Sequence, residues 1–302
     1  MRADGNPASV PGPSGLAVDF GGTKIAATRL REGEVDGARE VATDGDATPA
    51  AQLDAIEDLL ASLALKPDDR VGVAVAGRVD AAGRWHALNT ETLAQITRVP
   101  LRAALSARLS RPVRVENDAT AAAIGEYHFG AGRGTRNFAF LTVSTGVGGG
   151  LILDGRPVVS ASGLAGHVGF TTSTLADRRC GSGRMNTVES RASGRAIAAY
   201  AAAAGYPGLS AKQVYEANLS GEGWARALID TSAAAVAELC ANLKSLIDPD
   251  RIAIGGSIGL AEGYIDRVRA HLAGEPEIFR VPVVPTGLGR ASALYGVLAD
   301  RD

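Results

Sequence analysis

The chain has 302 residues, 46% of them hydrophobic and 21% charged, which is typical of a globular protein large enough for two lobes. A formal net charge of −2 argues against a basic nucleic-acid surface, and no apolar run reaches the ~18 residues that a membrane span needs. The two cysteines, Cys180 and Cys240, are too few for a disulfide framework and favour a reducing, cytoplasmic setting.

Strand patterns and helix patterns alternate along the chain, which predicts an α/β fold. Residues 1–14 come first and, being rich in Gly, Pro, Ala and Ser, predict a disordered leader. The predicted elements then follow in the order strand–turn–strand 18–30, helix 49–65, strand 71–75, helix 100–109, strand 113–115, helix 119–127, strand–turn–strand 138–153, helices 193–204 and 223–247, strand 251–254, a helix from about 260, strand 281–284 and helix 292–298.

A unit of strand, Gly-rich turn and strand occurs twice, at residues 18–30 and again at 138–153. The repetition predicts two related lobes, each offering one phosphate-binding turn. We expect a small N-terminal lobe of residues 15–118, joined by a C-terminal helix of about 287–302, and a large lobe of residues 119–286.

The first candidate site is the turn Asp-Phe-Gly-Gly-Thr-Lys. Paired glycines let backbone N–H groups approach an anion, the threonine and lysine suit phosphate oxygens, and the aspartate is placed to hold Mg²⁺ through water. The same residues also fit an ordinary hairpin turn, and they match neither the P-loop motif nor the dinucleotide-binding fingerprint. The candidate nucleotide contacts are Asp19, Gly21, Gly22, Thr23 and Lys24.

Two later turns also suit a nucleotide. The first joins hydroxyl side chains to four glycines between apolar strands, a combination that a plain flexible turn does not need. The second lies between a strand and a helix, where it allows close approach to an adenosine or merely caps the helix. The candidate contacts are Ser144, Thr145 and Gly146 in the first turn and Gly255, Gly256 and Ser257 in the second.

The pair Asn117-Asp118 lies where a predicted strand ends and a predicted helix begins. Both residue types are favoured helix N-caps, so capping alone would explain them. The functional alternative makes Asp118 the base that takes the proton of an attacking hydroxyl, with Asn117 as a hydrogen-bond partner of the substrate.

Together these segments resemble the ROK family of sugar kinases and repressors. Residues 19–24 match its nucleotide motif, 117–118 its catalytic Asn-Asp pair, 144–150 its second phosphate loop and 163–170 its signature. Within the family, the segments most similar to the bacterial N-acetylmannosamine kinases are 141–150, 163–169, 188–195 and 255–263.

The resemblance implies an actin-like, ribonuclease-H-like fold with the active site in the cleft between two lobes, which closes on the sugar about hinges near Asp118 and Thr286. It implies ATP and Mg²⁺ as cofactors, a homodimer, and phosphorylation of N-acetylmannosamine at the 6-hydroxyl in sialic acid and amino sugar catabolism. It makes Asp118 the catalytic base. The implied sugar contacts are Gly77, Arg78, Asn89, Thr90, Asn117, Asp118, His167 and Glu189.

Three alternatives to this function stay open. A kinase for another hexose, such as glucose, N-acetylglucosamine or fructose, would use the same chemistry, and a catalytically weak sugar-binding relative would keep the same motifs. A repressor of the family would need a helix-turn-helix before the nucleotide motif, and we expect none in the Gly/Pro-rich residues before Asp19. We therefore expect a sugar as the partner and no nucleic acid or membrane.

The chain departs from the family where a structural zinc site is usual. Phe170 stands in the place of the zinc-binding histidine, and the cysteine run is reduced to Cys180 within residues 178–187. One thiolate cannot make a four-coordinate site, so we predict no structural zinc. His167 replaces a glutamate found in most of the family, and as a neutral imidazole it both donates and accepts. His86 is isolated from other metal-ligand residues and is interpreted as a structural or surface residue.

Overall fold

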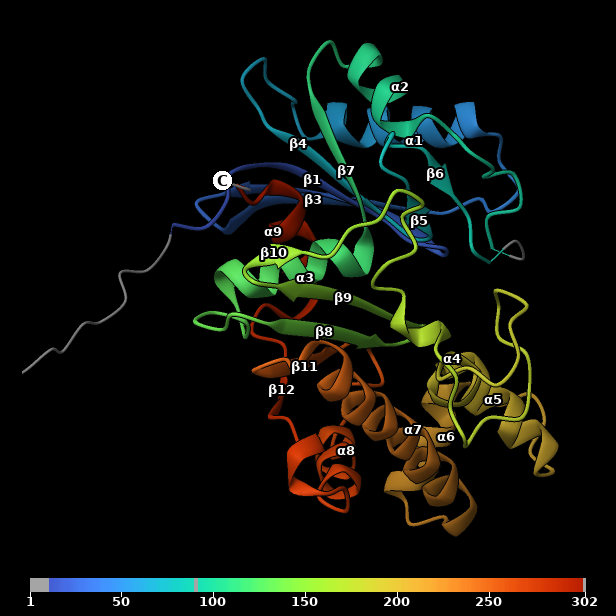
Figure 1. Ribbon diagram of the computed structural model, residues 1–302. Coiled ribbons are helices and arrows are strands. Elements are labelled where there is room, and N and C mark those ends of the chain that lie inside the picture. The colour runs from blue at the N-terminus through green and yellow to red at the C-terminus, as the bar shows by residue number, and fades with distance from the viewer. Residues whose placement is uncertain (1–10, 90–91, 301–302) are drawn as a thin grey trace, which may run out of the picture.

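The computed structural model describes residues 11–89 and 92–300, so most of the predicted leader lies outside the described residues. Two five-stranded sheets lie one beyond the other, each covered by helices on its outer side (Figure 1). The first sheet has the order β3-β2-β1-β4-β7 and the second the order β10-β9-β8-β11-β12. We call the first sheet with its helices the N-lobe and the second the C-lobe.

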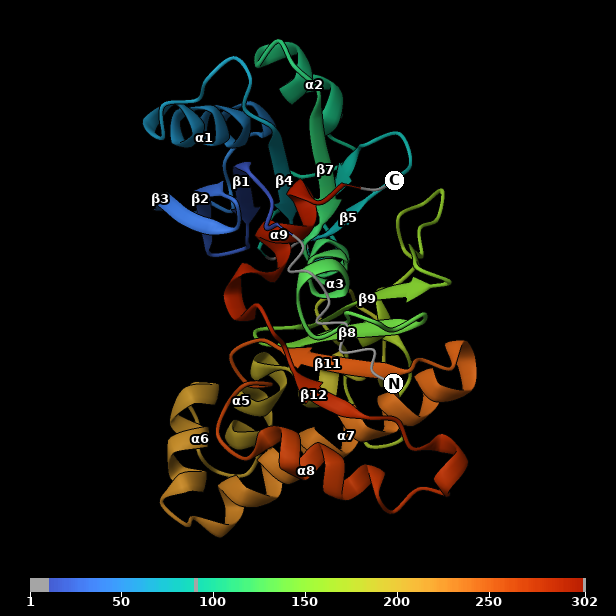
Figure 2. The same cartoon turned by 90° about the vertical axis from the view of Figure 1, so that its left-hand side faces the viewer.

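The N-lobe consists of β1 (Gly15–Phe20), β2 (Lys24–Arg31), β3 (Glu34–Ala42), α1 (Pro49–Ser62), β4 (Val71–Val75), the hairpin β5 (Arg78–Val79) and β6 (Trp85–His86), α2 (Leu101–Arg108) and β7 (Val113–Asn117). The C-lobe contains β8 (Phe138–Val143), β9 (Val147–Leu153), β10 (Arg156–Pro157), α4 (Glu189–Ala192), α5 (Gly194–Ala203), α6 (Ala211–Leu219), α7 (Gly223–Ile247), β11 (Arg251–Gly255), α8 (Tyr264–Leu272) and β12 (Val283–Pro285). Helices α3 (Asp118–Phe129) and α9 (Ser292–Leu298) lie between the sheets (Figure 2).

The two sheets share one topology. In each, the first three strands along the chain pair antiparallel as two consecutive hairpins. The next two strands run parallel to the first of the three, one beside it and the other beyond that one. This duplication confirms the predicted α/β fold of two related, actin-like lobes. Among the described residues, no helix is both long enough and apolar enough to cross a lipid bilayer.

Apolar side chains at the predicted spacing build a core in each lobe. In the N-lobe, Phe20 of β1 is fully buried and meets the indole of Trp85 edge-on at 4.8 Å, below the apolar face of α1. Thr48 caps α1, since its hydroxyl accepts a hydrogen bond from the N–H of Ala51, as the sequence indicated. In the C-lobe, the long helix α7 buries one face in the core and packs against α4, α5, α6 and α8.

The prediction lacked the short elements β5, β6, β10 and α4 and two longer ones, β3 and α6. Strand β3 is exposed along almost its whole length, so it lacks the apolar alternation by which a strand is found; it forms because β2 offers its backbone groups for pairing. Helix α6 does have a local signal. Ser210 and Gln213 form a capping box, with each side chain bonded to the other's backbone N–H, and this spacing is visible in the sequence.

The chain passes between the lobes after β7 and again after β12. Helix α3 packs on β8 and β9, whereas α9 packs on β1, β4 and β7. The two helices approach closely through Gly125 and Gly296, because a Cβ atom at Gly296 would overlap the carbonyl oxygen of Ala121. We propose that the lobes divide along this packing, with 15–118 and about 287–302 in one and 119–286 in the other.

The carboxylate of Glu126 ties α3 to the segment that enters α9. Its side chain is fully buried. It accepts hydrogen bonds from the N–H groups of Ala131 at 2.7 Å, Gly287 at 2.8 Å and Leu288 at 2.9 Å, and from the hydroxyl of Ser292 at 2.7 Å. Four donors satisfy a charge that would otherwise be costly in the interior.

Candidate active site

Asp118 is the first residue of α3, at the point where β7 ends between the lobes. Asn117 caps the helix, since its Oδ1 accepts from the N–H of Thr120 at 2.9 Å, which confirms the capping interpretation for that residue. The Asn117 amide donates to the carbonyl of Gly77 and to Oδ1 of Asp118, both at 2.7 Å. Oδ1 of Asp118 also accepts from the N–H of Ala119, while no described residue donates to its Oδ2. One carboxylate oxygen is therefore held and the other is available.

Two carboxylates face one cleft, and both resist ionisation. Burial raises the pKa of Asp118 to about 6, although the N–H of Ala119 and the amide of Asn117 oppose the shift. Burial also raises the pKa of Asp19 to about 6; the negative charge of Asp118 adds to this and the Lys24 cation opposes it. Shifts of this kind are typical of functional clefts, because the charged forms are stabilised only when a ligand supplies positive charge or hydrogen bonds.

The cleft has a volume of about 980 Å³ and is lined from both lobes and by both central helices. Of the residues predicted to contact a nucleotide, the structure brings five to the cleft: Asp19, Lys24, Ser144, Gly256 and Ser257. The predicted base, Asp118, lines it as well. The side chains of Ser144 and Ser257 lie 3.1 Å apart and join two of the predicted turns. The lysine currently pairs with Glu40 at 2.9 Å, an exposed ion pair that a phosphate could replace at little cost.

The other predicted nucleotide residues do not line the cleft but shape its turns. Gly21, Gly22 and Thr23 form the β1–β2 connection, a hairpin closed by the Gly21 N–H on the Lys24 carbonyl. Thr145 and Gly146 form the β8–β9 connection. Gly255 ends β11.

Arg290 is a lining residue that the sequence did not reveal. It lies on a 3₁₀ turn, Gly289–Ala291, that leads into α9, and it adds an exposed cation to the cleft. A single arginine in a loop carries no motif. Only the return of the chain from the C-lobe to the N-lobe brings it to the cleft.

His167 presents one ring nitrogen without a partner. Its Nδ1 lies 3.1 Å from the carbonyl of Leu164, and since a carbonyl only accepts, Nδ1 carries the hydrogen. Its Nε2 is buried and has no hydrogen-bond partner among the described residues. Burial lowers the pKa of His167, although the carbonyls of Gly77, Leu164 and Ala165 oppose this, so the neutral ring is favoured and Nε2 is an acceptor.

Glu189 lies behind the β8–β9 turn. Its Oε2 accepts from the N–H of Val147 at 3.0 Å, and a Cβ atom at Gly146 would come within 2.6 Å of the same oxygen. Burial raises the pKa of Glu189, while the N–H groups of Val147 and Gly181 and the charge of Arg195 oppose it. The carboxylate therefore fixes the turn from the C-lobe side.

The remaining predicted sugar residues come from the N-lobe. Gly77 has a φ of 101°, which favours glycine, and this conformation turns its carbonyl to Asn117. Arg78 donates to the carbonyl of Ser162 in the C-lobe. Asn89 lies beside Gly181, where a Cβ atom would come within 2.9 Å of its Nδ2. Thr90 lies outside the described residues.

Comparison with known proteins agrees with this arrangement. The sequence profile of the ROK family matches residues 15–299. This chain belongs to the ROK family. The match confirms the family that the motifs predicted and covers both lobes.

Individual ROK proteins are similar along nearly the whole chain. The N-acetylmannosamine kinase of Citrobacter koseri is 41% identical over 292 residues, which cover 96% of this chain and 99% of that protein. The bifunctional enzyme NanE/NanK of Brucella melitensis is 39% identical over 290 residues, 96% of this chain but 54% of that protein, so the chain spans about half the length of that relative. Among solved structures, a ROK family glucokinase from Streptomyces griseus in complex with glucose and AMPPNP has a TM-score of 0.80 at 30% identity, covering 94% of this chain and 97% of that chain.

Side-chain contacts hold the segment for which the sequence analysis expected a degenerate zinc motif. The guanidinium groups of Arg178 and Arg191 lie 3.6 and 4.0 Å from the ring centre of Tyr200, whose hydroxyl donates to Asp177 at 2.5 Å. Glu238 of α7 accepts from the hydroxyl of Ser173. Within residues 11–89 and 92–300, no three His, Cys, Asp or Glu side chains gather closely enough to hold a metal ion.

Proposed function

We propose that this protein is an ATP-dependent sugar kinase that phosphorylates N-acetylmannosamine at the 6-hydroxyl, with Asp118 as the base. Membership of the ROK family and 41% identity to an N-acetylmannosamine kinase over 96% of the chain support the activity. The observation that carries the proposal is the geometry of Asp118. One of its oxygens is fixed by the Asn117 amide and the Ala119 N–H, and the other is available in a cleft that both lobes and two Gly-rich turns line.

The proposed reaction needs little covalent chemistry from the protein. The sugar hydroxyl donates its proton to Oδ2 of Asp118 while its oxygen bonds the γ-phosphorus of ATP, and the bond between that phosphorus and the β,γ-bridging oxygen breaks to release ADP. Lys24, Ser144 and Ser257 line the cleft, where their polar groups are placed to contact the phosphates. The raised pKa of Asp118 makes it a stronger base than an exposed aspartate, since its ionised form is poorly solvated before substrate binds.

The carboxylates of Asp19 and Asp118 fit a divalent cation. Burial makes the ionised form of each carboxylate unfavourable, so a nearby cation would stabilise it. The charge of Asp118 contributes to the raised pKa of Asp19. Bound with ATP and held through water by Asp19, Mg²⁺ would supply charge neutralisation at the phosphates.

His167 supports an N-acetylated substrate over a plain hexose. Its unpartnered Nε2 is a hydrogen-bond acceptor. The amide N–H of an acetamido group is a fixed donor, whereas a hexose hydroxyl donates only when its O–H bond is rotated toward the nitrogen. A buried acceptor left without a donor costs free energy, so a sugar that supplies one binds more tightly.

A sugar panel tests this function. ADP release with Mg²⁺-ATP is measured for N-acetylmannosamine, N-acetylglucosamine, glucose, mannose and fructose, for the native protein and for His167→Leu, before and after zinc is removed by a chelator. We expect a preference for N-acetylmannosamine that zinc removal leaves unchanged, and in the variant a KM for that sugar raised about 10-fold at constant KM for ATP. Preference for glucose would establish another hexose kinase, and silence across the panel would favour either a sugar outside the panel or the weak sugar-binding relative.

The activity should fall in mild acid. Only the ionised Asp118 accepts a proton, and its pKa is raised to about 6, so kcat/KM should drop about tenfold per unit below that pH. The pH–rate profile between pH 5 and 8 measures this, with the coupling enzymes shown to be in excess at each pH. A rate that stays constant down to pH 5 would exclude a base with a raised pKa.

The homodimer and the cytoplasmic location expected from the resemblance and the composition also belong to this proposal. Both cysteines are free thiols, in keeping with a reducing compartment. Sedimentation of the purified protein would measure the oligomeric state directly.

A further inference from the structure

Strands β5 and β6 form a short hairpin in which Arg78 and His86 are direct cross-strand partners. Nη2 of Arg78 lies 3.2 Å from Nδ1 of His86, and Nε2 of His86 lies 3.2 Å from Oδ2 of Asp80. Asp80 is 5% exposed and His86 is 9% exposed. The three side chains thus form a line from a buried carboxylate through an imidazole to a guanidinium.

The two partners of His86 decide which ring nitrogen carries the hydrogen. A guanidinium only donates, so Nδ1 accepts from Arg78, and Nε2 then carries the hydrogen and donates to Asp80. The N–H of Arg84 holds the pKa of Asp80 well below its usual range against the opposing effect of burial, and the side chains of Arg84 and His86 act in the same direction. An ionised Asp80 therefore selects one tautomer of His86, and that tautomer is the one that can hold Arg78.

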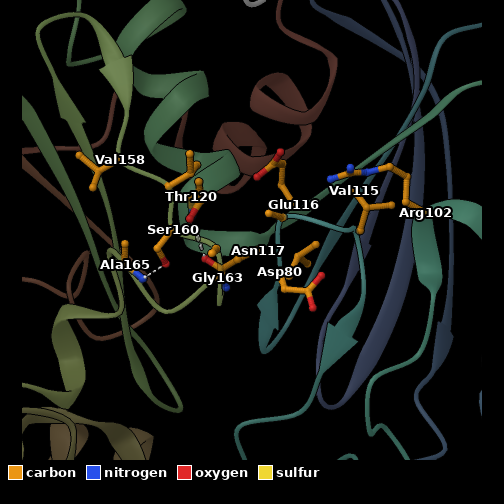
Figure 3. A pocket seen from close by; sticks show the side chains of 14 residues that line it. Asp80, Arg102, Val115, Glu116, Asn117, Thr120, Val158, Ser160, Gly163 and Ala165 are labelled. Atoms are coloured by element: carbon orange, nitrogen blue, oxygen red, sulfur yellow. Dashed lines mark hydrogen bonds between the residues drawn. The ribbon is translucent and has the colours of Figure 1, made fainter.

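Arg78, the last of these three side chains, contacts the opposite lobe. Arg78 donates through Nη1 to the carbonyl of Ser162, in the loop that follows β10. That loop and the segment that follows β5 both line a second cavity of about 490 Å³, which shares Asn117 with the site (Figure 3). Figure 3 shows Asp80 on one side of this cavity and Ser160 and Gly163 on the other.

We infer that Asp80 and His86 are positioning residues that fix the guanidinium of Arg78 between the lobes and so pre-organise it for oxygen atoms of the sugar. The inference rests on the proposed function, in which Arg78 contacts the sugar. Two of the five N–H groups of the guanidinium are engaged by His86 and Ser162, which leaves others for a substrate. An arginine held in this way loses less side-chain freedom when the sugar binds.

The test uses Asp80→Asn in the full-length protein. The asparagine keeps an acceptor for the N–H groups of Ala82 and Arg84, but its amide donates to His86 and so favours the opposite tautomer, with a hydrogen on Nδ1 that opposes the donor of Arg78. Arg84→Met is the matched control, because it removes another donor to the same Asp80 oxygen, at 2.7 Å, without touching His86 or Arg78.

Two readouts separate positioning from structural support. Nitrogen NMR of the imidazole ring in the free protein, with the signal assigned by its loss in His86→Phe, should show Nε2–H in the native protein and in Arg84→Met and Nδ1–H in Asp80→Asn. The KM for the sugar should rise roughly 10-fold in Asp80→Asn and stay constant in Arg84→Met, with the KM for ATP unchanged in both.

A double-mutant cycle decides whether the effect passes through Arg78. If it does, Asp80→Asn should raise the KM for the sugar in the native background and leave it unchanged in Arg78→Ala. Equal effects in both backgrounds, an unchanged tautomer, or an equal loss in Arg84→Met would overturn the inference. If Asp80→Asn fails to fold, His86→Phe replaces it in the same cycle. Failure of the proposed function is distinguishable, because it would show as another preferred sugar or as no turnover of any sugar, while the tautomer of His86 is still read in the free protein.

Discussion

Replacement of Asp118 by asparagine is expected to lower kcat by about 10³-fold while sugar binding is retained. The amide oxygen can still accept from the N–H of Ala119 and the Asn117 amide, so the start of α3 keeps its geometry. In place of Oδ2 stands an amide nitrogen that takes no proton from a hydroxyl. Single-turnover ADP formation measures the loss, and calorimetry with the sugar alone measures binding. Lost binding with unchanged residual turnover would exclude Asp118 as the base.

The same variant should be more stable than the native protein above pH 6. The pKa of Asp118 is raised from 3.8 to about 6 in the folded state, so its contribution to the free energy of unfolding is fully present below pH 3.8 and is lost as the pH rises through 6. The asparagine does not ionise and should be favoured by at most about 3 kcal/mol at pH 8, with no difference near pH 4. Urea unfolding at both pH values checks the sign. A native protein that is more stable than the variant at pH 8 would contradict the raised pKa.

Replacement of Glu126 by alanine is expected to lower the free energy of unfolding by about 3–5 kcal/mol. The change leaves the N–H groups of Ala131, Gly287 and Leu288 and the hydroxyl of Ser292 without their acceptor in the interior. It also opens a cavity at the crossing of α3 and α9. Urea denaturation measures the loss.

Two control variants make the Glu126 result specific. Glu126→Gln keeps the shape and one acceptor oxygen, so its loss should be smaller than that of the alanine variant. Glu216→Ala removes a helical glutamate that is exposed on α6, and it should change the free energy of unfolding by less than about 0.5 kcal/mol. An alanine variant at position 126 that loses less than about 1 kcal/mol would show that the four hydrogen bonds contribute little net stability.

The two strand–turn–strand units, the cap at Asn117 and the helix of Asp118 could be predicted because their signals are local. Apolar period, glycine turns and capping residues act over a few neighbouring positions, so one sequence displays them without reference to the fold. The same signals led to the ROK family and to the aspartate proposed as base. Strand β3 escaped because an exposed edge strand is defined by its partner and not by its own side chains.

Only the tertiary structure decided which polar side chains are buried against one another. Glu126 meets Gly287 and Leu288, which lie more than 150 residues away. His86, which in the sequence was an isolated histidine, lies close to Asp80 and Arg78 in the chain, and the β5–β6 hairpin is what turns its ring between them. The raised pKa of Asp19 likewise requires burial and the charge of Asp118 from another strand's end. The sequence by itself determined most of the elements, the family and the chemistry of the turns, whereas the closing of two lobes on each other determined which side chains are desolvated together. The physical reason is that burial, long-range hydrogen bonds and charge interactions arise only from packing, which no local pattern encodes.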